Sequence, residues 1–231
     1  MKKYGVIALA ILLAAAAVGV LLFVMKNVHS GRAADYESLP PGEPLAVATI
    51  DGEPFVLDHC KELLQINLYL HENQTIHDVI QYFVEQEVIV REAKRNHIEV
   101  TDEDVQAFIE QQIKNFQECG ENEIGLRHKQ MLSLLGLSET EYYQMFFETY
   151  RNELIAAKYE NWLYEGFLYD KIKEKGKEIG DNLTDKEMKK IQEKEAKIYN
   201  KDIMEKYKKY YEKVTDKLIK DAKIEYLEGF D

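Results

Sequence analysis

The stretch that decides the fold spans residues 48–142 and opens with the hairpin sequence Ala48-Thr49-Ile50-Asp51-Gly52-Glu53-Pro54-Phe55. An Asp-Gly pair suits the positive φ angles of a tight type I′ turn, so the flanking segments 45–50 and 53–57 are predicted to pair as strands. Pro54 lacks an N–H group, which predicts that the second strand lies at a sheet edge. The folded part of the chain is therefore expected to begin with a small hairpin.

Helices are expected to follow the hairpin over most of the remaining chain. Four residue pairs have capping-box spacing, in which a hydroxyl accepts from the backbone N–H three residues on and the carboxylate there bonds back to the first residue. They are Thr75 with Asp78, Thr101 with Asp104, Ser138 with Glu141, and Thr184 with Glu187. Asp58 is predicted to cap a further helix through Leu70, and Asn96 to end the helix that follows Thr75. These signals predict a mainly helical protein.

Two further segments of this stretch carry a family resemblance. They are Arg91-Glu92-Ala93-Lys94-Arg95-Asn96-His97-Ile98-Glu99-Val100-Thr101-Asp102-Glu103-Asp104-Val105 and Leu135-Gly136-Leu137-Ser138-Glu139-Thr140-Glu141-Tyr142. With the hairpin, they resemble the N-terminal peptide-binding domain of the SurA and PrsA foldases, a fold shared in outline with the chaperone part of trigger factor. The resemblance covers residues 47–168 and, more loosely, residues 210–226. It implies a helical chaperone domain with a small β-hairpin that holds unfolded chains and has no catalytic residues.

The resembling foldases carry a parvulin-type proline isomerase module at the position that residues 171–200 occupy here. Such a module is a mixed sheet with several glycine-rich turns, whereas residues 171–201 hold two glycines and a helical pattern only. Proline isomerase activity is therefore not expected. In these foldases the chain then returns as a helix, and the corresponding long C-terminal helix is predicted here at residues 205–222. A third strand at residues 224–226 is expected beside the hairpin.

Residues 4–25 contain no charged side chain and are long enough, at about 1.5 Å per residue, for a helix to cross a bilayer core about 30 Å thick. A retained transmembrane anchor over residues 1–26 is predicted in preference to a cleaved signal peptide, because no small-residue cleavage site follows the apolar run closely. Residues 27–44 are rich in Gly and Pro and are expected to form a linker. The chaperone domain is then expected at residues 45–231.

The orientation of this anchor is weakly determined by charge. Two lysines precede the apolar run, and Lys26 and Arg32 follow it, so the positive-inside bias is almost balanced. The resembling families work outside the cytoplasm. We therefore expect a single-pass protein of a bacterial cell membrane, with its domain on the extracytoplasmic side.

The charge of the chain excludes one class of partner. The net charge is −12, which lacks the basic footprint of a nucleic-acid-binding protein. Residues 35–170 hold 27 acidic against nine basic side chains, whereas residues 171–223 hold 17 lysines against 12 acids. The two blocks could attract each other within the chain, and separate solvated helix faces explain the same pattern. No nucleic acid partner is expected.

No catalytic, cofactor or metal site is expected. Cys60 and Cys119 fall on different predicted helices, and whether they form a disulfide is left open. A metal site could combine Cys60 with His59, His71 and His77, but adjacent residues point about 100° apart on a helix, and no HExxH or CxxC spacing occurs. Paired acids stand at helix starts, where they complement the helix dipole. The protein is therefore not expected to be an enzyme.

A long helix rich in aromatic residues is predicted to begin after Ser138. Its aromatic side chains cover more faces than one apolar stripe needs. They are Tyr142, Tyr143, Phe146, Phe147, Tyr150, Tyr159, Trp162, Tyr164, Phe167 and Tyr169. Either a second helix packs on the other side, or some of these residues form an apolar surface for client polypeptides. The candidate residues of that surface are Met131, Met145, Phe146, Phe147 and Tyr150, because methionine and aromatic side chains adapt to varied partners.

Two functions of different class follow from these patterns. The first is a membrane-anchored, extracytoplasmic holdase that binds unfolded or secreted polypeptides without isomerase chemistry. The second is a structural or adaptor protein of the same fold that binds one fixed partner, or itself as a homodimer. The breadth of clients separates the two, because a holdase binds unrelated unfolded proteins and an adaptor does not.

We predict that the mature protein retains residues 4–25, because this apolar run has spanning length and no close cleavage site. N-terminal sequencing of the protein isolated from cells tests this prediction, and a mature chain that begins near Ala34 would contradict it. Protease added outside intact cells should remove the folded domain.

Overall fold

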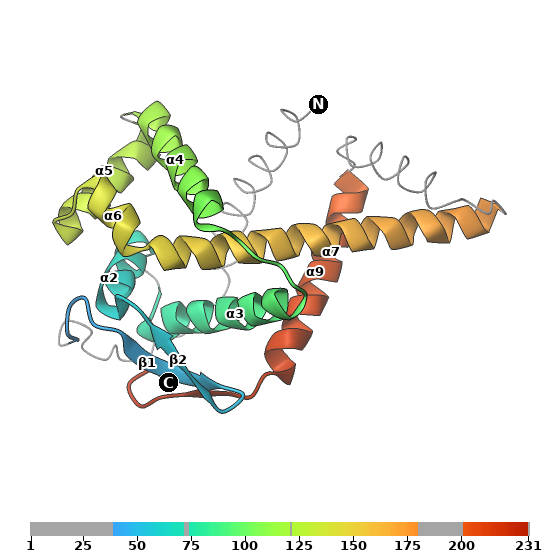
Figure 1. Ribbon diagram of the computed structural model, residues 1–231, viewed down its shortest axis with the longest axis horizontal. Helices are drawn as coiled ribbons and strands as arrows, with labels where there is room; N and C mark the ends of the chain where they lie inside the picture. The colour runs from blue at the N-terminus through green and yellow to red at the C-terminus, as the bar shows by residue number, and fades with distance from the viewer. Residues whose placement is uncertain (1–38, 72–73, 121, 180–200, 231) are drawn as a thin grey trace.

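The computed structural model describes residues 39–71, 74–120, 122–179 and 201–230 (Figure 1). The strands are β1 (Leu45–Ile50), β2 (Glu53–Leu57) and β3 (Ile224–Tyr226). The helices of these residues are α2 (Cys60–Leu70), α3 (Ile76–Arg95), α4 (Asp102–Cys119), α5 (Glu123–Leu135), α6 (Glu139–Met145), α7 (Phe147–Ile179) and α9 (Lys201–Asp221). The fold is mainly helical with one small sheet, as predicted.

The predicted hairpin forms between β1 and β2. Asp51 and Gly52 have φ angles of 56° and 82°, which are the two positive values that a type I′ turn requires. The strand order is β2-β1-β3 with both pairs antiparallel, so β2, which contains Pro54, lies at an edge as expected. The third strand beside the hairpin is also confirmed, and it brings the far end of the chain back to β1.

Hydrogen bonds from backbone N–H groups hold this return segment against the hairpin. The Asp51 N–H donates to the Lys223 carbonyl at 2.9 Å, and the Lys223 N–H donates to Asp51 Oδ1 at 3.1 Å. The Leu227 N–H donates to the Val47 carbonyl at 3.0 Å. The chain that follows α9 is therefore part of the folded domain.

Three of the predicted capping boxes are present, at Thr75, Thr101 and Ser138, and α3 ends at Asn96 as predicted. The fourth predicted box, Thr184 with Glu187, lies outside the described residues. The predicted cap at Asp58 is wrong. The chain turns sharply out of β2, and His59 precedes α2 in a left-handed conformation, with φ 51° and ψ 40°, that has no side-chain cap.

The long helix predicted to begin after Ser138 is divided into α6 and α7. The division is at Phe146, whose φ of −100° and ψ of 21° depart from helical values. The Phe146 side chain is only 2% exposed and packs in the core. The bend turns α6 toward α2 and α5, whereas α7 runs along α3 (Figure 1). We call the residues Tyr142, Tyr143, Phe146 and Tyr150 the aromatic bend.

Helix α3 joins two clusters of buried side chains. Its first half contributes Val79, Ile80 and Val84 to a cluster with the sheet, α2, α4, α5 and α6. Its second half contributes Ile89 and Val90 to a cluster with α7 and α9. Helix α9 crosses α3 and α7 near one end of α3 (Figure 1). The described part of the chain is thus organised around α3 and α7.

Helix α9 corresponds to the predicted return helix, and its described part runs over Lys201–Asp221. Tyr207 is 4% exposed, and its hydroxyl donates to the Glu160 carbonyl of α7 at 2.7 Å. Its ring lies against those of Tyr164 and Phe167, with centroids 4.8 and 5.7 Å away. Helix α9 is therefore packed on α7 through aromatic contacts.

Two basic side chains of α7 hold the start of α4. Arg151 donates to the Val100 carbonyl at 3.1 Å and pairs with Asp102. Lys158 donates to Asp104 Oδ2 at 2.9 Å. The hydrogen bond from Lys158 and that from the backbone of Thr101 lower the pKa of Asp104. One carboxylate thus caps α4 and links it to α7.

The predicted anchor, residues 4–25, lies outside the described residues. Within the part of the chain that the structure describes, no helix has both the length and the apolar character needed to cross a bilayer.

We predict that deletion of residues 203–231 unfolds or aggregates the rest of the domain, because it exposes the α9-facing sides of α3 and α7 and removes β3. Each large apolar side chain that loses its burial costs about 1.5–3 kcal/mol, and a domain has only about 5–15 kcal/mol in total. Circular dichroism with thermal melting measures this. Tyr207→Phe is the matched control, since it removes only one hydrogen bond and should cost about 1 kcal/mol. An unchanged melting curve of the deletion variant would contradict this assignment of α9.

Candidate functional site

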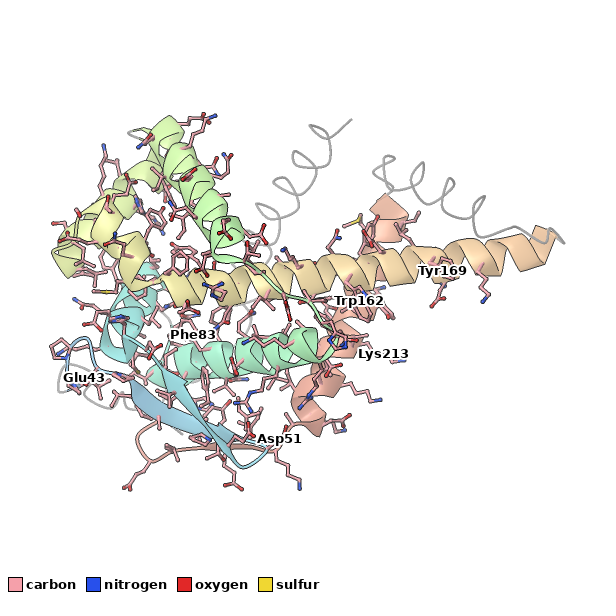
Figure 2. The ribbon with its side chains drawn as sticks, viewed as in Figure 1. Glu43, Asp51, Phe83, Trp162, Tyr169 and Lys213 are labelled. Carbon is pink, nitrogen blue, oxygen red and sulfur yellow. The ribbon has the colours of Figure 1, made fainter. Side chains whose placement is uncertain are left out.

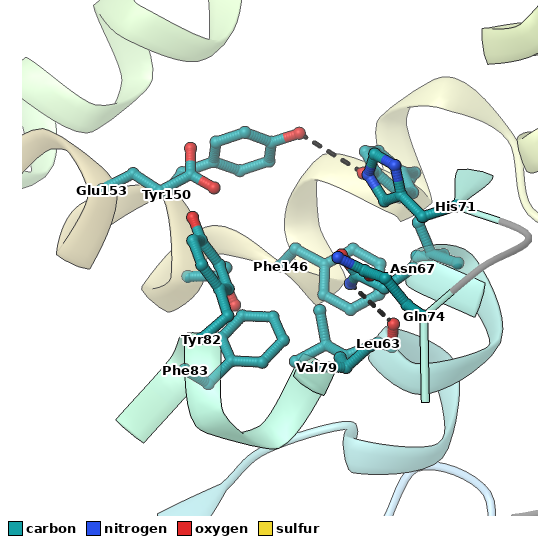
Figure 3. A pocket seen from close by; sticks show the side chains of 13 residues that line it. Leu63, Asn67, His71, Gln74, Val79, Tyr82, Phe83, Phe146, Tyr150 and Glu153 are labelled. Atoms are coloured by element: carbon teal, nitrogen blue, oxygen red, sulfur yellow. Dashed lines mark hydrogen bonds between the residues drawn. The ribbon is translucent and has the colours of Figure 1, made fainter. Parts of the chain in front are cut away.

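A pocket of about 180 Å³ lies between α2, α3, α6 and α7, next to the aromatic bend (Figure 3). Thirteen residues line it: Leu63, Ile66, Asn67, His71, Gln74, Val79, Tyr82, Phe83, Tyr142, Phe146, Thr149, Tyr150 and Glu153. They come from four helices and from the segment between α2 and α3. The pocket is therefore a product of the tertiary fold and not of one local motif.

One side of the pocket is apolar. Leu63 of α2, Val79 of α3 and Phe146 at the bend are all buried. Figure 3 shows their side chains close to one another at the end of the pocket away from Glu153. Phe83 of α3 adds a ring that lies in the layer between α3 and α7 (Figure 2). This wall can contact an apolar group by burial alone.

The aromatic bend supplies hydroxyl groups to the same pocket. The Tyr150 hydroxyl donates to that of Tyr142 over 3.5 Å, and the Tyr142 ring lies 5.0 Å from the Phe146 ring, centroid to centroid. Burial raises the pKa of Tyr142 to about 12 and the pKa of Tyr150 well above its ordinary value. Both hydroxyls are therefore neutral hydrogen-bonding groups at physiological pH.

Glu153 of α7 is the carboxylate of the pocket. The residue is exposed at the mouth of the pocket, and desolvation by the protein around it raises the pKa of the carboxyl to about 7. Its charge in turn raises the pKa values of Tyr82 and Tyr150, after the larger effect of their own burial. Figure 3 shows the Tyr82 hydroxyl pointing toward the Glu153 carboxyl. The open end of the pocket is thus acidic.

The five residues proposed from the sequence for client binding do not form one surface. Met131 and Phe146 are 5% and 2% exposed and belong to the core. Met145, Phe147 and Tyr150 are partly buried and pack against that core. Phe146 and Tyr150 line the pocket, whereas the other three do not. Client binding by this set remains a prediction, and the pocket is where two of its members meet.

Sequence reasoning did not select Tyr82 and Glu153. One signal was present in the sequence. Phe146, Tyr150 and Glu153 stand at positions i, i+4 and i+7, which share one face of a helix. An acid on a face that is otherwise aromatic indicates a polar opening beside an apolar wall. Tyr82 comes from α3, more than 60 residues earlier, and no spacing rule joins it to α7.

Most of the aromatic side chains farther along α7 pack against neighbouring helices. Tyr159 and Phe167 are buried in the cluster that includes α3 and α9, so packing of further helices accounts for them. Trp162 is 47% exposed and stacks on Tyr159 with ring centroids 5.7 Å apart. The excess of aromatic faces is thus mostly structural in this part of the helix.

The cysteine and histidine residues that were considered from the sequence form no bridge or cluster. Cys60 and Cys119 are free thiols, and burial raises the pKa of Cys60 to about 12. His59 has its ring 6.0 Å from that of Phe146, and His77 Nδ1 lies 2.9 Å from the Phe230 carbonyl. In the described ranges no group of three His, Cys, Asp or Glu side chains is arranged to hold a metal ion.

Comparison with protein families gives one finding. A family model described as "SurA-like N-terminal domain" matches residues 1–159, which is more than half of the 231 residues. The chain belongs to this SurA-like family. No parvulin domain is indicated along it. A comparison with curated proteins finds no match. Membership indicates a chaperone-type protein that binds polypeptides, and the mainly helical fold with its small sheet is consistent with it.

We predict that the aromatic bend is needed for stability of the SurA-like domain. Phe146→Ala should lower the free energy of unfolding by about 3–5 kcal/mol, because it leaves a cavity in the core. Trp162→Ala, a change of comparable size at an exposed position, should cost well under half as much. Urea unfolding followed by circular dichroism measures both values. Equal losses in the two variants would show that the bend is not a core element.

Proposed function

We propose that the protein is a holdase that binds unfolded or secreted polypeptides on the extracytoplasmic side of a membrane and does not isomerise prolyl bonds. The observation that carries the proposal is the pocket beside the aromatic bend, in a domain of a chaperone-type family. Its apolar wall and neutral hydroxyls suit side chains that an unfolded polypeptide exposes.

Exposed apolar side chains on α2 and α5 support contacts with an unfolded polypeptide outside the pocket. Helix α5 exposes Ile124, Leu126 and Leu134, and Tyr69 of α2 is exposed beside it. The Tyr69 hydroxyl donates to Gln130 Oε1 of α5 at 3.0 Å, which places the two helices next to each other.

The connection between α7 and α9 supports binding without catalysis. Only residues 180–200 separate the end of α7 from the start of α9. That length is far below the roughly 50 residues of even a small domain. We therefore propose that the protein acts by binding alone and is not an enzyme.

The N-terminal segment supports the proposed location. Residues 4–25 have the length and composition of a membrane anchor, and residues 27–44 would tether the domain to it. We propose that the anchor keeps the domain close to polypeptides that emerge from the membrane. This arrangement needs no partner other than the client.

We predict that the full-length protein in lipid nanodiscs suppresses the aggregation of unrelated unfolded proteins at a near-stoichiometric ratio. Burial of apolar surface drives such binding, so it should depend little on salt between about 0.1 and 0.5 M, a range in which exposed charges are progressively screened. Light scattering of two or more denatured proteins measures the effect.

Two controls accompany this assay. Empty nanodiscs report the effect of lipid alone, and refolding of a proline-limited protein reports isomerase activity, which should stay at the uncatalysed rate. If the protein leaves the aggregation of every client unchanged, the holdase proposal fails. An adaptor that binds one fixed partner, or a homodimer, is then the better reading.

A further inference from the structure

Glu153 has no cationic partner among the described residues. Desolvation is the cause of its raised pKa, and no hydrogen bond or neighbouring charge of the described chain contributes to it. The nearest basic residues along α7 are engaged elsewhere. Arg151 pairs with Asp102 and Glu148, and Lys158 pairs with Asp104. The carboxylate at the pocket opening is therefore available to a cation from outside the domain.

A second hydrogen-bond acceptor of the pocket lacks a partner, and the lining brings no positive charge of its own. Gln74 Oε1 is buried and has no hydrogen-bond partner within the described part of the chain. Burial, and after it the charge of Arg127, lowers the pKa of His71, so its imidazole is neutral at physiological pH and brings no positive charge. The lining thus offers neutral donors and unpaired acceptors, and none of its thirteen residues is a lysine or an arginine.

The size of the pocket limits its occupant. Its volume of about 180 Å³ is below the range of about 300–1,000 Å³ that is usual for cofactors and drug-sized ligands. A cavity of about 150 Å³ already accepts a molecule the size of benzene. One side chain of a polypeptide therefore fits, and a folded element does not.

Aromatic rings line the path between the apolar wall and the carboxylate. Tyr82 and Phe83 of α3 have ring centroids 5.2 Å apart at an interplanar angle of 72°, and Tyr150 faces the pocket from α7. Rings of this kind attract a cation over their faces and accept the methylene stem of a long side chain. A side chain that is both long and cationic matches this order of an apolar wall, aromatic rings and a carboxylate.

We propose that the pocket between α2, α3, α6 and α7 binds one lysine or arginine side chain of the client polypeptide, with its cationic head at Glu153 and its stem against Tyr82 and Phe83. The inference rests on the proposed holdase function and names the class of side chain that the site selects. Residues 35–170 hold 27 acidic against nine basic side chains, which favours approach of a basic segment.

The test uses the full-length protein in nanodiscs and a set of unstructured fluorescent peptides that are identical except at one central position. That position is lysine, norleucine or glutamate. Fluorescence anisotropy at pH 8, above the pKa of about 7 that desolvation gives Glu153, should give a Kd about 5- to 10-fold lower for the lysine peptide than for the norleucine peptide. The glutamate peptide should bind more weakly than both.

Two variants separate the role of Glu153 from general effects of charge. Glu153→Gln should abolish the preference for lysine and change the affinity for the norleucine peptide by less than about twofold, because only the pairing of opposite charges is lost. Glu153→Lys should reverse the preference in favour of glutamate. Glu103→Gln removes the same charge from an exposed position of α4 outside the pocket, and it should leave the lysine preference intact.

The outcomes distinguish this inference from the function on which it rests. If the wild-type protein binds all three peptides equally, or if Glu153→Gln retains the lysine preference, the pocket does not select basic side chains, although the holdase proposal stands. If no peptide binds and aggregation is not suppressed, the holdase proposal fails and this inference fails with it.

Discussion

Helix α7 carries apolar side chains on more than one face. The rest of the domain depends on the need to shield all of these faces from water. A single neighbour could bury only one stripe. Helix α3 runs along one side, α4 is held through Arg151 and Lys158, and α9 returns from the far end of the chain to pack on a third surface. The small sheet then forms around β1, because the return of α9 places β3 beside it.

The pocket lies where this covering is incomplete. At Phe146 the helix axis changes direction, so α6 packs toward α2 and α5 while α7 continues along α3. The side chains of α2 and α3 line the space beside the bend but do not fill it. Glu153 stands at the open end, two turns beyond Phe146 on α7. The same change of direction that buries the Phe146 ring therefore leaves the space that we propose for a client side chain.

The parts of the fold that the sequence predicts are those fixed by local interactions. The turn at Asp51 and Gly52 and the capping boxes at Thr75, Thr101 and Ser138 depend on residues no more than a few positions apart. No proline or glycine marks the bend at Phe146 in the sequence. The bend results from the packing of the Phe146 ring against helices that are distant in the sequence, so no local signal predicts it. The burial of Met131 likewise depends on contacts with residues that are distant in the sequence.

The pocket could not be predicted from the sequence for a related reason. Tyr82 and Glu153 lie close together only because α3 and α7 pack side by side. Phe146 and Tyr150 serve both the core and the pocket wall, so the proposed client binding would be tied to stability. A ligand that binds only the folded form raises the free energy of unfolding by mass action, so an occupied pocket should hold the bend more firmly than an empty one.

Glu153 differs from Phe146 and Tyr150, because it makes no ion pair with the described residues and is exposed to solvent. Under the proposed function, a substitution at this position would therefore change the preference among clients without altering the packing on which α7 depends.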